Sequence, residues 1–159
     1  MTNTLWVPGS ETEAETFLWH TPQPRLNFGL AYLHRQEALR VLGTYEVVPS
    51  YRGLPNLRLG FGVQGIGTGN PGYFATTERE VRTPSGALAS FAGIGFRANE
   101  SHSHGLLGLR FSPNGPWSFG AQLDGHGRHL FVTHDASATT FGVYLVDMKS
   151  FGLLVGTNW

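Results

Sequence analysis

Apolar and polar side chains alternate with a period of two along most of the chain from about residue 25 onward. In residues 57–64, for example, Leu59 and Phe61 alternate with Arg58 and Gly60. Alternation of this kind is typical of β-strands that have one apolar and one polar face. Ten strands are predicted, at 26–32, 39–47, 57–64, 88–97, 107–111, 117–124, 129–134, 140–146 and 151–159, and in a charged segment, 73–82, that we expect to extend into water.

Short stretches rich in Pro, Gly, Asn, Asp and Ser separate these strands, at 49–50, 67–72, 83–86, 112–115, 125–127 and 135–138. Such residues adopt the backbone angles that chain reversal requires. The connections are short and carry no helical pattern, so neighbouring strands should pair antiparallel. The sequence therefore predicts an all-β fold, a closed antiparallel up-and-down (meander) barrel of about ten strands, within a range of about eight to twelve. Residues 25–159 form the barrel domain, and residues 1–24 form an N-terminal extension or the first strand or strands.

The two faces of the predicted strands differ in kind. One face is almost entirely Leu, Phe, Val, Ile and Trp, whereas the other carries glycines and the charged residues. If the glycine face points inward, its small residues let a narrow barrel close and its arginines and carboxylates pair inside. The apolar face then forms an outer belt that is stable in lipid. The residues predicted to line the lumen are Arg40, Glu46, Arg58, Gln64, Arg97, Arg110, Gln122 and Asp124.

Aromatic residues near the ends of the predicted strands fit the interfacial girdles of a membrane barrel. They are Trp6, Trp19, Tyr32, Tyr45, Tyr73, Trp117 and Trp159. In a soluble barrel the same residues would belong to the core or the rim.

Composition agrees with a surface that is not covered by charge. The chain has 22 glycines, and 14% of its residues are charged, against roughly 25% in an ordinary soluble domain. Eleven basic and eleven acidic residues give a formal net charge of zero, so no strong field attracts nucleic acid. There is no cysteine, which excludes disulfides and thiolate metal sites. No apolar run reaches the length of about 18 residues that a transmembrane helix needs, so contact with lipid would be made by strands.

The last predicted strand ends in a recognisable pattern, in which Phe151, Leu153 and Val155 alternate toward Trp159. This pattern resembles the C-terminal assembly signal of bacterial outer-membrane β-barrel proteins. The resemblance implies a location in the bacterial outer membrane, recognition by the barrel-assembly machinery, an even strand number and both termini in the periplasm. It would place five connections on the outer side, at 34–37, 67–72, 99–104, 125–128 and 147–150. The first six residues lack the features of a secretion signal, so we expect this sequence to be the mature form.

Two groups of residues are candidates for chemistry. His102 and His104 have a spacing that supplies two imidazoles to Zn²⁺ or Cu²⁺. Glu100 is nearby, but the sequence identifies no third ligand, and a solvated loop is the favoured interpretation.

Asp124, His126 and His129 gather at another turn, and Ser118 shares a strand face with Asp124. A serine, a histidine and an acid together would allow acyl transfer. However, Ser118 and His126 are eight residues apart, about 26 Å along an extended strand. A nucleophile would therefore have to come from another strand.

These observations favour an integral outer-membrane β-barrel with a structural or narrow-pore transport role, which is not an enzyme and has no cofactor and no metal. A lumen inside about ten strands is small and tends to be filled by side chains. Its partners would be the lipid bilayer or detergent, and not nucleic acid. One alternative is a soluble β-barrel that binds a small apolar ligand or self-assembles through its apolar face. Another is an outer-membrane lipid-modifying hydrolase.

Overall fold

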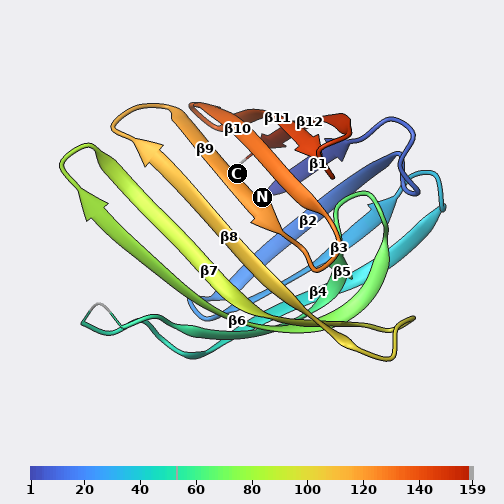
Figure 1. The fold of residues 1–159 in the computed structure, drawn as a ribbon, viewed down its shortest axis with the longest axis horizontal. Helices are drawn as coiled ribbons and strands as arrows, with labels where there is room; N and C mark the ends of the chain where they lie inside the picture. Colours follow the sequence, from blue (N-terminus) through green and yellow to red (C-terminus); the bar gives the residue numbers. More distant parts are fainter. Residues whose placement is uncertain (53, 158–159) are drawn as a thin grey trace.

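The structure, a computed structural model, describes residues 1–52 and 54–157. In these residues twelve strands form one closed barrel, in which each strand pairs antiparallel with its neighbours in chain order and β12 pairs with β1 (Figure 1). The strands are β1 (Thr2–Trp6), β2 (Ala14–Gln23), β3 (Leu26–Leu33), β4 (Ala38–Val48), β5 (Leu57–Gln64), β6 (Asn70–Thr83), β7 (Gly86–Arg97), β8 (Ser103–Pro113), β9 (Trp117–Leu123), β10 (Arg128–Ala136), β11 (Thr139–Val146) and β12 (Ser150–Thr157).

The predicted fold class, an all-β antiparallel meander barrel, is confirmed. The strand number lies at the upper end of the predicted range, because residues 1–24 supply β1 and β2. Within residues 1–52 and 54–157, the structure holds no helix capable of spanning a membrane.

The meander places alternate connections at opposite ends of the barrel. One end, called the loop end below, carries the connections 7–13, 34–37, 65–69, 98–102, 124–127 and 147–149. The other end carries both termini and the remaining connections, and is called the terminus end. The five connections that the sequence resemblance grouped on one side all belong to the loop end.

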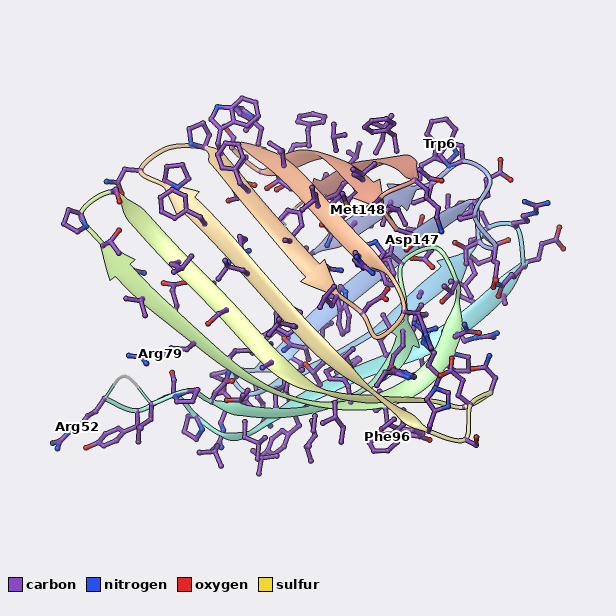
Figure 2. All side chains as sticks on the ribbon, viewed as in Figure 1. Trp6, Arg52, Arg79, Phe96, Asp147 and Met148 are labelled. Atoms are coloured by element: carbon purple, nitrogen blue, oxygen red, sulfur yellow. The ribbon has the colours of Figure 1, made fainter. Side chains whose placement is uncertain are left out.

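The apolar face of the strands points away from the barrel axis, as predicted. Leu59 and Phe61 on β5 are 47% and 43% exposed, and Leu109 on β8 is 50% exposed. Figure 2 shows Trp6 and Phe96 on opposite sides of the barrel, each pointing away from the ribbon. Each strand thus contributes to an apolar outer surface that encircles the molecule.

The glycines of the inner face make room for aromatic rings. Three of them lie directly opposite an aromatic residue of the neighbouring strand: Gly60 opposite Phe74, Gly108 opposite Phe91 and Gly120 opposite Phe131. A Cβ atom on any of the three would lie 2.0–2.2 Å from the facing ring. Such cross-strand pairs let a large side chain cover the backbone beside it.

The inner face is not purely polar, because two apolar clusters occupy it. Leu5, Val7 and Val146 form one cluster, and Ala31, Leu33 and Leu42 form the other. Trp19 packs against the second cluster, so its prediction as an interfacial girdle residue was wrong. It shares the inner side of β2 with the buried Glu15, and its ring lies beside Gly29, where a Cβ atom would be 3.2 Å away.

Candidate functional site

The connection between β5 and β6, residues 65–69, folds into the barrel and is called the plug loop below. Ile66 in this loop packs against the cluster of Leu5, Val7 and Val146. These residues belong to the region of β11, β12 and β1, and β11 lies six places from β5 in the ring of twelve strands. The plug loop therefore reaches across the lumen at the loop end, to residues on the opposite side of the ring.

Hydrogen bonds tie the plug loop to three other connections. The amide of Thr12 donates to the carbonyl of Gly67 at 3.2 Å, and the amide of Ile66 donates to Oδ2 of Asp124 at 2.9 Å. The side-chain amide of Gln36 donates to the carbonyl of Thr68 at 3.0 Å. The three glycines of the loop all have φ between 68° and 86°, a conformation that glycine adopts without steric cost.

Below the plug loop the lumen holds three cavities that are lined by both polar and apolar side chains. A cavity of about 270 Å³ lies directly beneath it. This cavity shares Glu78 and Gln122 with one of about 430 Å³, and shares Thr44 and Arg58 with one of about 570 Å³. Together they form a lumen that is lined on several sides by hydrogen-bonding groups.

The eight residues predicted to line the lumen all lie on the inner side of their strands or in the adjoining turn. Four of them, Arg58, Gln64, Gln122 and Asp124, line the cavity of about 270 Å³ beneath the plug loop. Arg110 on β8 lines the cavity of about 430 Å³, together with Glu78. The other three are Arg40 and Glu46 on β4 and Arg97 on β7, and their contacts are described next.

One group of charged side chains inside the lumen is paired. Arg58 contacts Glu78 at 3.1 Å and Glu46 at 3.9 Å. Asn56 donates from its side chain to Oε2 of Glu46 at 2.8 Å. Arg40, in contrast, belongs to no ion pair among the described residues. Its Nη1 donates to the carbonyl of Leu39 at 3.4 Å, and its buried Nε has no hydrogen-bond partner. The pairing keeps the guanidinium of Arg58 from being an isolated charge beside apolar walls.

Arg97 joins two connections at the loop end. Its side chain is 5% exposed, and its guanidinium lies 3.5 Å from Glu100 and 3.8 Å from Asp124. Nη2 also donates to the backbone carbonyl of Asp124 at 3.3 Å. A buried guanidinium between two carboxylates holds the connection 98–102 against the turn 124–127.

Asp124 and His129 form a buried pair beneath this turn. Nε2 of His129 lies 3.0 Å from Oδ2 of Asp124, and Nδ1 of His129 accepts from the amide of Asp147 at 3.2 Å. Burial by itself would raise the pKa of Asp124. The hydrogen bonds from His129, Gly127 and Ile66 outweigh that effect and hold the pKa well below its ordinary value of 3.8. The pair therefore anchors an ionised carboxylate that receives the plug loop.

The serine, histidine and acid of the hydrolase hypothesis do not come together. The hydroxyl of Ser118 is hydrogen-bonded to that of Ser112 at 2.9 Å. Ser118 pairs with Thr133, four residues along β10 from His129, a separation of about 13 Å. Both ring nitrogens of His129 already have partners.

His126 instead joins the two histidines of the weak metal prediction. Nε2 of His126 lies 3.0 Å and 3.1 Å from the two carboxylate oxygens of Glu100. Oε2 of Glu100 also lies 3.2 Å from Nδ1 of His104 and 3.7 Å from Nε2 of His102. The hydrogen bond from His126 lowers the pKa of Glu100. Glu100, His102, His104 and His126 are called the histidine cluster below, and their side chains can together hold a metal ion.

The pairing of β8 with β9 explains why His126 reaches the cluster. Leu107 pairs with Leu123, so three further steps along the same register place His104 opposite His126. The sequence predicts a turn at 112–115, but the register of this hairpin is not fixed by alternation alone. Grouping His126 with the histidine nearest in sequence hid the relation.

The residues of the predicted assembly signal lie on the outer surface. Phe151 is 70% exposed, and Leu153 and Val155 on the same strand are 49% and 47% exposed. Trp159, the fourth member, lies outside the described residues.

Comparison of the chain with protein-family models, with curated proteins and with solved structures finds no match. The function is therefore argued from the geometry of the barrel and its loop end.

Proposed function

We propose that this chain is an integral β-barrel protein of a bacterial outer membrane, with a structural or narrow-pore role and a lumen held closed by the plug loop. The observation that carries the proposal is the reversal of the usual distribution of side chains. Among the described residues, only six hydrophobic ones are buried, while large apolar side chains on all twelve strands or their ends are exposed.

A surface of this kind is unstable in water. Soluble monomers rarely expose contiguous apolar patches of more than a few hundred Å². Each Å² of apolar surface removed from water contributes about 25 cal/mol, and a bilayer covers the whole belt at once. The closed ring also leaves no strand edge unpaired, which hydrocarbon would penalise. Lipid is therefore the environment that fits the outer face.

The lumen fits this proposal better than it fits a soluble carrier of apolar ligands. Arg58, Glu78 and Gln122 line the cavity beneath the plug loop together with several apolar side chains. An apolar ligand that filled this cavity would remove the charged and amide groups from water without replacing their hydrogen bonds. A lumen that contains charged side chains and has a plug at one end suits a narrow passage that is closed at rest.

The membrane proposal is tested by solubility and by electrophoresis. The purified chain should need detergent to stay monodisperse, should float with liposomes in a density gradient, and should change its gel migration when boiled. A chain that is monomeric and monodisperse in plain buffer would contradict the proposal. A defined soluble oligomer that hides its apolar face would favour the self-assembly alternative instead.

A further inference from the structure

We propose that the histidine cluster, formed by Glu100, His102, His104 and His126, binds one divalent transition-metal ion, with Zn²⁺ as the best match. This site is independent of whether the barrel lies in a membrane. Three of its residues belong to connections of the loop end, and the fourth, His104, is the second residue of β8 at the same end. The effect of the ion would be to tie the connection 98–102 to the turn 124–127.

The spacing of the donor atoms is close to that of a metal site. One donor atom from each of the four residues lies within 4.8 Å of all the others. Ligand atoms about 2.1 Å from a tetrahedral Zn²⁺ ion lie about 3.4 Å from one another. Oε2 of Glu100 already lies 3.1–3.7 Å from a ring nitrogen of each of the three histidines. Small side-chain rotations would complete the geometry.

The state of His104 is an independent indication of a ligand. Its side chain is 4% exposed, and neither of its ring nitrogens has a hydrogen-bond partner. Nδ1 lies 3.2 Å from the Glu100 carboxylate, but not in a geometry that makes a hydrogen bond. A buried polar group without a partner is unfavourable, because it has lost its hydrogen bonds to water. A metal ion between His104 and Glu100 would satisfy both groups.

The surroundings of the cluster support a cation in spite of the nearby Arg97. The guanidinium contacts Oε1 of Glu100 at 3.5 Å, which leaves Oε2 for the metal and fixes the orientation of the carboxylate. Asp124 lies 3.8 Å from the same guanidinium and balances its charge. Arg97 therefore positions a ligand of the site and does not itself bind the ion.

The donor types select the class of metal. Three imidazoles and one carboxylate suit Zn²⁺, Cu²⁺ or Ni²⁺, and not the all-oxygen sites preferred by Ca²⁺ and Mg²⁺. Four protein ligands fill a tetrahedral shell and leave no open position, which is typical of structural zinc sites and not of catalytic ones. The ion would have a structural role, because it would link the connection 98–102 to the turn 124–127. It would hold the turn whose Asp124 accepts the amide of Ile66 from the plug loop.

The test is metal binding by the folded chain in detergent, after treatment with a chelator. Calorimetric titration with Zn²⁺ should give saturable binding of one ion per chain. Titration with Co²⁺ should give the intense visible absorption of a tetrahedral site with nitrogen and oxygen ligands. The variants H102A and H126A should each weaken binding by about tenfold or more.

Both substituted side chains are largely exposed, at 64% and 49%, so the barrel should still fold, as heat-dependent gel migration will report. The matched control is H20A, because His20 is an exposed histidine at the opposite end of the barrel. Absence of saturable binding, or binding that H102A and H126A leave equal to that of H20A, would overturn the proposal. Failure of the membrane proposal would appear instead as solubility without detergent, with metal binding unchanged.

Discussion

At the scale of single residues, the inner wall is organised by glycines that face aromatic rings. The sequence predicted that small residues point inward, because glycine shares its parity with the buried charges. It did not predict that Phe74, Phe91 and Phe131 also point inward. Large apolar residues were assigned to the outer face, so an aromatic residue at an inward position interrupts the expected alternation. The cross-strand pairs resolve this, because each ring occupies the space that a glycine leaves.

Substitution of one such glycine should displace its ring. In G108V, the new side chain would collide with Phe91, whose ring lies 2.0 Å from the position of the added Cβ. Overpacking of this kind costs about 1–3 kcal/mol, measurable as a lower free energy of unfolding in urea. G105V on the same strand is the control, because no atom lies within 4 Å of its added Cβ. Equal losses in the two variants would show that the glycines matter only for backbone flexibility.

Arg97 illustrates what burial adds to an ion pair. R97A would leave Glu100 and Asp124 without their shared cation, and breaking a buried pair in this way costs about 3–5 kcal/mol. R82A is the matched control, since Arg82 also contacts a carboxylate, that of Glu80, but is 88% exposed. It should change the free energy of unfolding by no more than about 0.5 kcal/mol. Both values should be measured in chelator, so that a metal at the histidine cluster does not contribute.

The sequence indicated only part of the candidate metal site. His102, His104 and Glu100 lie close together in sequence, so their proximity could be predicted. His126 was grouped with His129 because the two are three residues apart. The structure separates them, since His129 is an inward residue of β10 and His126 lies in the preceding turn. Which residues of a turn face which neighbour depends on the hairpin register, which alternation alone does not fix.

At the scale of elements, the sequence predicted most of the strands and the positions of the turns between them, but not the path that one of these connections takes into the lumen. Strand β1 was left open because it has only five residues, too few to establish a period. The plug loop was predicted as an ordinary turn, because its glycines and its asparagine fit chain reversal equally well. Only the position of Ile66 against residues from the opposite side of the ring reveals that it enters the lumen.

Shortening the plug loop should open the lumen. Gln64 pairs with Asn70 at the end of the β5–β6 ladder, so the two-residue sequence Asn-Gly in place of residues 65–69 would close this hairpin with a tight turn. In planar bilayers the shortened chain should conduct ions, whereas the parent chain should conduct little. The variant T68A, which keeps the length of the loop, should behave like the parent. Equal low conductance in all three would mean that other inner side chains block the lumen.

At the scale of the whole molecule, the direction in which a side chain points should decide how a new charge is tolerated. Ala121 and Gln122 are adjacent on β9, but Ala121 is exposed on the outer face while Gln122 lines the lumen. A lysine on the lipid-facing surface costs up to about 2–4 kcal/mol near the bilayer midplane. A121K should therefore lower the free energy of unfolding in lipid far more than Q122K does. The reverse order would contradict the membrane proposal and favour water outside the barrel.

The strands also differ widely in length around the ring. Strand β1 has 5 residues and β9 has 7, whereas β6 has 14. At about 3.4 Å per residue, β1 spans about 17 Å and β6 about 48 Å, while the hydrophobic band of such proteins is about 25 Å tall. A bilayer around this barrel would therefore contact short strands on one side and long strands on the other. The bilayer beside β1 would have to become thinner, or the whole barrel would tilt. If the barrel tilts, infrared dichroism of oriented membranes should report strands inclined unequally to the membrane normal.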